Sequence, residues 1–227
     1  PASTTVDMAF RVQLGPYPEA AANSDYTLFG WDGAVLSLPG FYPTLAVKQG
    51  ESWMLDQPAR HGDVLFNQAA LYQLDIALPR EMMVAAGGVT LNVIDNPDGS
   101  RTWQIAGGPL RDMTVIAGPF LAVSEQAAGA LVTSYYLPGH EAAAQAVLAH
   151  ATASLRLYSD LYGPYPYTEL DLVEAPLNVR GMEYSGLALI GEDLYGDRRV
   201  FLTFLVAHEV GHQWCYAVVG NAPYRYP

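Results

Sequence analysis

The spacing of apolar residues changes near Pro138-Gly139, and this change constrains the fold more than any other feature of the chain. Before it, apolar and polar residues alternate, as along residues 71–78, with the period of two that is typical of half-buried strands. After it, residues 141–162 carry apolar side chains three and four positions apart, which is helical spacing. The sequence therefore predicts an α+β protein, with an antiparallel, sandwich-like β-domain over residues 1–132 and a mixed α/β part over residues 133–227.

Short apolar runs separated by Gly, Pro, Asn and Asp predict the strands of the first part. The segment Asn96-Pro97-Asp98-Gly99-Ser100 lies between two of these runs and is a strong signal for a hairpin turn. The predicted strands cover residues 34–38, 71–78, 89–94, 102–105 and 113–117.

Two long helices packed against a sheet are expected in the second part. The first covers residues 141–162 and ends at Gly163-Pro164, because glycine adopts the left-handed conformation after a helix and proline cannot continue it. The second has Asp197 as its N-cap and runs over residues 198–219. The sheet contains strands over residues 169–175 and 187–190.

The charge balance and one long apolar run exclude two classes of partner. The chain has 23 Asp and Glu residues against 11 Lys and Arg, a net charge of −12, so its surface repels phosphate backbones and no nucleic-acid partner is expected. Residues 200–219 are long enough to cross a bilayer, but they include His208, Glu209 and His212, which are costly in lipid. We therefore predict a buried helix and no membrane-spanning segment.

His208-Glu209-Val210-Gly211-His212 is the segment that carries chemistry. Positions i and i+4 lie on one face of a helix, so both imidazoles can reach one metal ion. Glu209 lies beside the first ligand and can take a proton from a zinc-bound water, whose pKa zinc lowers to about 7. Because such polar groups are costly on an apolar helix unless they are used, the pattern predicts a Zn²⁺ site with His208 and His212 as ligands and Glu209 as general base.

A second candidate segment, Gly181-Met182-Glu183-Tyr184-Ser185-Gly186, precedes His208 by about 25 residues. Taken alone, it has two interpretations. It is either a turn that enters an edge strand with Glu183 solvated, or a fixed carboxylate beside the metal that binds the free α-ammonium group of a substrate.

Two upstream segments accompany these motifs, Leu-Tyr-Gly-Pro-Tyr-Pro-Tyr at residues 161–167 and the run over residues 169–176. With Gly181-Met182-Glu183 and the His-Glu-Val-Gly-His-Gln-Trp of residues 208–214, they resemble in order and spacing the aminopeptidase N-like zinc metallopeptidases, which include leukotriene hydrolase. The resemblance implies that residues 133–227 form the first half of a thermolysin-like zinc-peptidase domain, preceded by the end of the family's N-terminal β-domain.

The resemblance also implies a role for each candidate residue. His208 and His212 would hold zinc, and Glu209 would activate the zinc-bound water that attacks the peptide. Glu183 would bind the N-terminal amine of a peptide substrate, which makes the enzyme an exopeptidase. Gly181-Met182 would line the cleft and help to place the scissile peptide.

The chain departs from the family pattern at three places that matter for activity. Arg180 stands two residues before Met182, where the family has glycine. Tyr184 stands where the family has asparagine. The family spacing puts the third zinc ligand at position 231, four residues past Pro227, and an oxyanion-stabilising tyrosine further on. We therefore expect a fragment that supplies two of the three ligands, binds zinc weakly and does not hydrolyse peptides.

Truncation is also expected to leave apolar surface uncovered around Val206, Val210 and Trp214, which favours self-association. The predicted function of the parent protein is zinc-dependent removal of N-terminal residues from peptides. Two alternatives stay open. One is a related zinc hydrolase, such as an endopeptidase or an epoxide hydrolase-like enzyme, and the other is a non-catalytic scaffold with the same fold.

Overall fold

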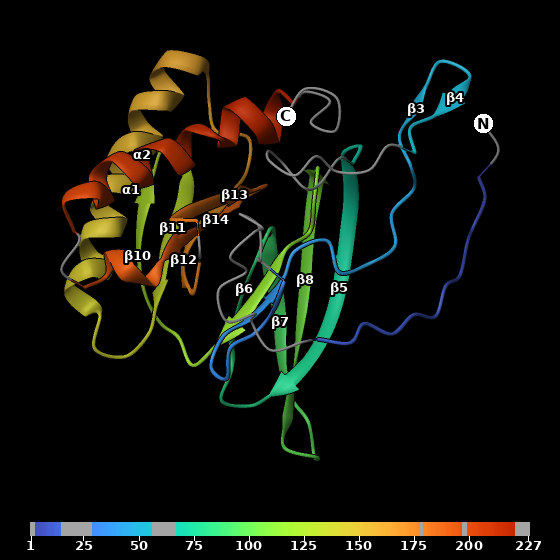
Figure 1. Cartoon of the computed structure of the whole chain (residues 1–227), viewed down its shortest axis with the longest axis horizontal. Coiled ribbons are helices and arrows are strands. Elements are labelled where there is room, and N and C mark those ends of the chain that lie inside the picture. Colours follow the sequence, from blue (N-terminus) through green and yellow to red (C-terminus); the bar gives the residue numbers. More distant parts are fainter. Residues whose placement is uncertain (1–2, 15–28, 56–66, 178, 197–198, 221–227) are drawn as a thin grey trace.

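The computed structural model describes residues 3–14, 29–55, 67–177, 179–196 and 199–220. Within these residues the fold is mixed α+β, with mostly antiparallel sheets and two α-helices (Figure 1). The α+β class is thus confirmed, and both helices follow the predicted change of apolar period.

A five-stranded sheet carries the candidate site. Its strands, in spatial order, are β10 (Leu121–Ala127), β11 (Ala130–Tyr136), β12 (Glu169–Ala175), β14 (Leu187–Gly191) and β13 (Gly181–Tyr184). The three central strands are parallel, whereas β10 and β13 pair antiparallel with their neighbours. Every residue of β14 is buried, as expected for a strand covered on both faces. Among the described strands, β13 pairs with β14 alone and is therefore an edge of the sheet.

Helix α1 (Glu141–Tyr162) connects β11 to the parallel strand β12 and has the bounds that the sequence predicts. Val147, Ala151 and Leu155, four residues apart, are fully buried in the main core. Gly163 ends the helix with φ 104°, and its N–H donates to a carbonyl of the last turn. In Figure 1, α1 and α2 (Leu202–Gly211) lie on one side of the five-stranded sheet, where α1 contacts β10 and β11 and α2 contacts β13 and β14.

The first part of the chain is built from antiparallel strands, as predicted. The Asn96 N–H donates to Ser100 O at 2.9 Å and closes the predicted hairpin turn. A three-stranded sheet has the order β5 (Ala70–Pro79), β8 (Ser100–Leu110) and β7 (Val89–Asp95). A four-stranded sheet has the order β1 (Gly30–Trp31), β2 (Leu36–Leu38), β9 (Val115–Gly118) and β6 (Met83–Ala86), and β3 (Lys48–Gln49) pairs with β4 (Ser52–Trp53).

Residue 132, the predicted end of the first domain, lies inside β11, and the preceding strand β10 belongs to the same five-stranded sheet. Side-chain bonds also join the two parts, since the Ser185 hydroxyl donates to Asp112 Oδ2 at 3.0 Å. Residues on both sides of the predicted boundary therefore build one sheet, and the division into two domains stays a prediction.

The second helix is shorter than the apolar run that predicts it. Its predicted N-cap, Asp197, lies outside the described residues, and a 3₁₀ turn at Arg199–Phe201 precedes α2. The α-helix ends at Gly211, so one continuous helix over residues 198–219 is wrong. Across the described residues, no helix is both long and apolar enough to cross a membrane.

Wide turns replace the helix over Gln213–Val218. The Ala217 N–H donates five residues back to His212 O at 3.0 Å, and Tyr216 is extended, with φ 178°. Helical periodicity could not indicate this change, because it reports only which positions are apolar. The segment leaves the helix where its polar side chains bond to other elements.

The three residues around which the sequence expects uncovered apolar surface are themselves buried. Val206 and Val210 are fully buried and Trp214 is 6% exposed, because they belong to the core between α1, α2 and the sheet. The exposed apolar side chains of this region include Phe204 on α2 and Leu161 on α1. Val206, Val210 and Trp214 are therefore not part of an uncovered surface, apolar side chains near them are exposed, and self-association stays a prediction.

Candidate metal centre

Two histidines one turn apart at the end of α2 face each other. The Nε2 atoms of His208 and His212 are 3.1 Å apart, and their ring centroids are 4.6 Å apart. Two tetrahedral ligands at about 2.0–2.1 Å from one zinc ion lie roughly 3.3 Å from each other, so the observed separation fits a shared ion. Phe204 stacks on the His208 ring from the preceding turn. The two imidazoles are thus close enough to hold one ion, as the i, i+4 spacing predicts.

The other ring nitrogen of His212 faces β13. His212 Nδ1 lies 3.2 Å from Glu183 Oε1 and 3.3 Å from the backbone oxygen of Cys215. Both partners are acceptors, so they hold the proton on Nδ1 and leave the Nε2 lone pair directed at His208 and at a metal. Burial, and then the neighbouring His212, lower the pKa of His208, which favours the neutral imidazole that a metal requires.

Glu209 lies between α2 and β13 and is 3% exposed. Its Oε2 atom is buried and has no hydrogen-bond partner among the described residues. Burial, and to a lesser extent the charge of Glu183, raises the pKa of the Glu209 carboxyl to about 9. A desolvated carboxyl with an unpartnered oxygen is the arrangement expected of a functional acid or base rather than of a structural side chain.

The structure excludes the interpretation in which Glu183 is solvated. The residue lies on the edge strand β13, and its side chain is 10% exposed. One ligand atom each from Glu183, Glu209 and His212 lie within 4.8 Å of one another. The chain therefore offers two overlapping donor sets, the His208–His212 nitrogen pair and this carboxylate-rich cluster, and they share His212.

Gly181 and Met182 lie on opposite faces of β13. Gly181 is on the Glu183 face, directly under the Glu209 carboxyl, where it forms part of the site. Met182 is 7% exposed and belongs to a buried apolar cluster with Leu187. The expectation that the Met182 side chain lines the cleft is therefore wrong, because the alternation of the strand turns it into the core.

Gly181→Ala should destabilise the protein by about 1–3 kcal/mol, because the added methyl group overpacks the site. A Cβ atom at this position would overlap Glu209 Oε1 and lie 2.6 Å from Glu209 Cδ. Urea unfolding of the metal-free chain measures the loss. In a Glu209→Ala background the same substitution should cost much less, because the overlapping atoms are gone.

Gly211→Ala is the matched control for this substitution. A Cβ at Gly211 meets only Tyr158 at 3.6 Å, an ordinary contact, and alanine favours a helix. It should be neutral or stabilising. An equal cost of Gly181→Ala with and without the Glu209 side chain would show that the two residues are not in contact.

A shallow cavity of about 260 Å³ opens beside the histidines, between α1 and the end of α2. Tyr158 and Tyr162 line it from α1, and both imidazoles border it. The histidine pair is therefore reached from one side by this cavity and flanked on the other by Glu183 and Glu209.

Sequence reasoning missed the polar residues that support the site. Gln213 is fully buried next to His212, and Asp112 is fully buried before β9. The Tyr216 hydroxyl donates to Asp112 Oδ2 at 2.9 Å, and Arg111 donates to backbone oxygens of the same C-terminal segment. The apolar residues that follow Gln213 were the available signal for its burial, whereas Asp112, between Arg111 and Met113, had no such signal.

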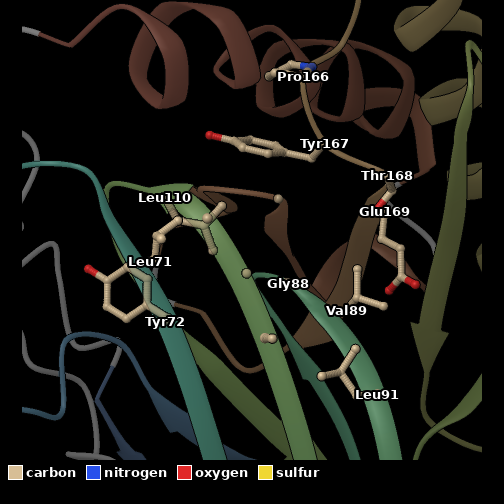
Figure 2. A pocket seen from close by; sticks show the side chains of 14 residues that line it. Leu71, Tyr72, Gly88, Val89, Leu91, Leu110, Pro166, Tyr167, Thr168 and Glu169 are labelled. Atoms are coloured by element: carbon tan, nitrogen blue, oxygen red, sulfur yellow. The ribbon is translucent and has the colours of Figure 1, made fainter.

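A larger cavity of about 520 Å³ lies apart from the histidines, at the end of the three-stranded sheet (Figure 2). Leu71 and Leu110 line it from the strands, and Tyr167 covers it from the loop before β12. Glu169 lies at one end, and burial raises the pKa of its carboxyl. The four polar residues of the candidate centre do not line this cavity.

No protein-family model and no curated protein matches this chain.

Proposed function

We propose that this protein is a zinc-dependent metallopeptidase that removes N-terminal residues from peptides. The observation that carries the proposal is the pair of histidine Nε2 atoms 3.1 Å apart, beside the buried and unpartnered Glu209 carboxyl. We also propose that residues 133–227 form the first half of a thermolysin-like domain. The order of α1, a sheet with an antiparallel edge strand, and α2 supports that assignment.

Zn²⁺ fits the donors present. Imidazole nitrogen is a preferred zinc ligand, and His208 and His212 would hold the ion through Nε2. Glu183 and Glu209 would balance part of its charge from the β13 side. When bound, zinc supplies a Lewis acid for the scissile carbonyl and lowers the pKa of water to about 7.

Glu209 performs the proton transfers in this proposal. A nearby dication favours the charged form of a carboxyl, so Glu209, which is protonated at neutral pH in the metal-free chain, becomes available as a base. It accepts a proton from the attacking water and returns it to the amide nitrogen that leaves. Because Gly181 has no side chain, the Glu209 carboxyl has space to lie against it.

The edge strand β13 supplies the binding surface for a peptide. An extended peptide can add to it as a further strand, so that main-chain hydrogen bonds place the scissile bond. Glu183 lies on this strand and is directed at the histidine pair. A carboxylate at this place pairs with the α-ammonium group of the first residue, which limits cleavage to the N-terminal peptide bond.

Glu183→Gln tests this function and its substrate preference. The assay uses a protein that carries residues 1–227 together with any residues that follow them, called the extended protein below. Loss of the carboxylate should lower kcat/KM for aminoacyl anilides with a free amine by about 10–100-fold. This factor corresponds to the free energy of one charge-assisted hydrogen bond. N-acetylated substrates should lose much less.

Glu192→Gln, an exposed carboxylate after β14, is the matched control and should change neither rate. Equal losses on free and N-blocked substrates would show that Glu183 does not bind the amine, which favours an endopeptidase. An extended protein with no zinc-dependent hydrolysis would refute the proposed function.

A further inference from the structure

A buried amide side chain joins the strand that carries Glu183 to the segment that carries His212. Gln213 follows His212 directly and is fully buried. Its Nε2 donates to Tyr184 O at 2.9 Å, and its Oε1 accepts from Gly186 N–H at 2.9 Å. Both partners are backbone atoms of the turn between β13 and β14, and the first of them belongs to the residue after Glu183.

The orientation of this amide follows from its partners. If oxygen and nitrogen were exchanged, the oxygen would face the Tyr184 carbonyl and the NH₂ group would face the Gly186 N–H. One contact would then pair two acceptors and the other two donors. Only the orientation described above therefore forms both hydrogen bonds. The Tyr165 hydroxyl also lies near Oε1, at 3.4 Å, and makes its shorter bond, 3.0 Å, to Glu169 O.

The helix does not supply this connection by itself. α2 ends at Gly211, and Gln213 begins the segment of wide turns. His212 still donates its N–H to His208 O at 3.3 Å, but the residues after it are not held by regular helical hydrogen bonds. Tertiary bonds have to fix where this ring lies relative to β13, and Gln213 makes two of them.

We infer that Gln213 is a positioning residue, whose amide fixes Glu183 opposite His212 and so sets the distance between the amine-binding carboxylate and the metal ligand. This inference rests on the proposed function for its catalytic meaning, but not for its geometry. The geometry it has to maintain is the 3.2 Å separation between His212 Nδ1 and Glu183 Oε1. Only a side chain with both a donor and an acceptor can bind this turn at both atoms.

Gln213→Met tests the inference, because methionine keeps the length of the side chain and removes both hydrogen bonds. In the metal-free 227-residue chain, exchange of the Gly186 amide should accelerate by roughly 10–100-fold more than global unfolding explains, since its acceptor is lost. The neutral His212 ring, observed by ¹⁵N NMR, should change from one tautomer, with the proton on Nδ1, to a mixture. Zinc affinity should fall by about 10–100-fold, as it does when the groups that orient ligands are removed.

Gln213→Glu keeps the acceptor for Gly186, and above the pH at which the new carboxyl ionises it loses the donor to Tyr184. It should keep the Gly186 amide protected and still mix the His212 tautomers. Glu174→Met is the matched control, because Glu174 is also fully buried and accepts from a backbone N–H, that of Leu137 at 2.8 Å, away from the site. It should lower global stability without changing the Gly186 exchange or the His212 tautomer.

The inference is overturned if Gln213→Met leaves the Gly186 amide and the His212 tautomer as they are in Glu174→Met. If the methionine variant does not fold, the wild-type protein decides, because a Gln213 side-chain amide that exchanges as fast as exposed glutamines contradicts the two hydrogen bonds. An extended wild-type protein that does not bind zinc would end the proposed function and leave these two metal-free measurements valid. Equal zinc affinity of wild type and Gln213→Met would remove the positioning role alone.

Discussion

Glu209→Gln should reduce peptide hydrolysis by the extended protein by about 10²–10⁴-fold, the contribution of a general base, while zinc stays bound. Glutamine keeps the shape of the side chain and cannot accept a proton from the attacking water. Steady-state kinetics on an aminoacyl anilide measure the loss, and a chelator competition assay measures zinc. A variant that keeps more than half of the wild-type rate would remove Glu209 from the chemistry.

The same substitution should stabilise the metal-free chain, which gives a second measurement that needs no activity. The folded-state pKa of Glu209 is raised to about 9 from a usual value of 4.5, so the folded protein holds a proton that the unfolded chain has lost. The stability that this proton contributes is complete below about pH 4.5 and is lost as the pH rises towards 9. At pH 7 the advantage of glutamine should be on the order of 3 kcal/mol.

Urea unfolding with chelator present at several pH values checks this expectation. The difference in unfolding free energy between Glu209→Gln and wild type should grow from pH 5 to pH 8. A difference that does not change with pH would mean that the carboxyl is not desolvated as the structure has it.

His208→Ala and His212→Ala should each weaken zinc binding by at least about 100-fold, because each removes one of two nitrogen ligands. Competition with a chromophoric chelator measures the affinity in the 227-residue chain and in the extended protein. His150→Ala is the matched control, since His150 lies on α1 and its Nε2 contacts the Thr203 hydroxyl, not the site.

The two histidines also distinguish between the overlapping donor sets. If the ion were held by Glu183, Glu209 and His212, His208→Ala would leave zinc affinity nearly unchanged, whereas Glu183→Gln would lower it. If His208→Ala and His212→Ala each weaken zinc binding and Glu183→Gln has only a small effect on it, the result supports the pair of histidine nitrogens as the zinc ligands.

The elements that the sequence predicts well are those whose apolar spacing repeats over several turns or residue pairs. Residues 141–162 keep helical spacing over six turns and end at a glycine followed by a proline, and the helix has the predicted bounds. β5 shows the predicted alternation of exposure along its length. The short strand β13 and the end of α2 are too brief for such averaging, so contacts with neighbouring elements decide their form.

At the candidate centre, the motif predicts which side chains are polar and reactive but not how they are held. His208 and His212 come together because the helix repeat puts them there. Glu183 lies opposite His212 only because β13 pairs at the sheet edge and Gln213 binds the turn that follows it. No local spacing records a bond between residues that are about thirty positions apart.

The α+β class, the bounds of α1 and the proximity of the two histidines could be predicted from the amino-acid sequence. They follow from interactions between near neighbours along the chain, which leave a periodic pattern. The end of α2 at Gly211, the burial of Met182 in the core and the packing of Glu209 against Gly181 became known only from the folded structure. Those outcomes depend on hydrogen bonds and packing between segments that are distant in sequence. One amino-acid sequence does not indicate which distant segments come into contact.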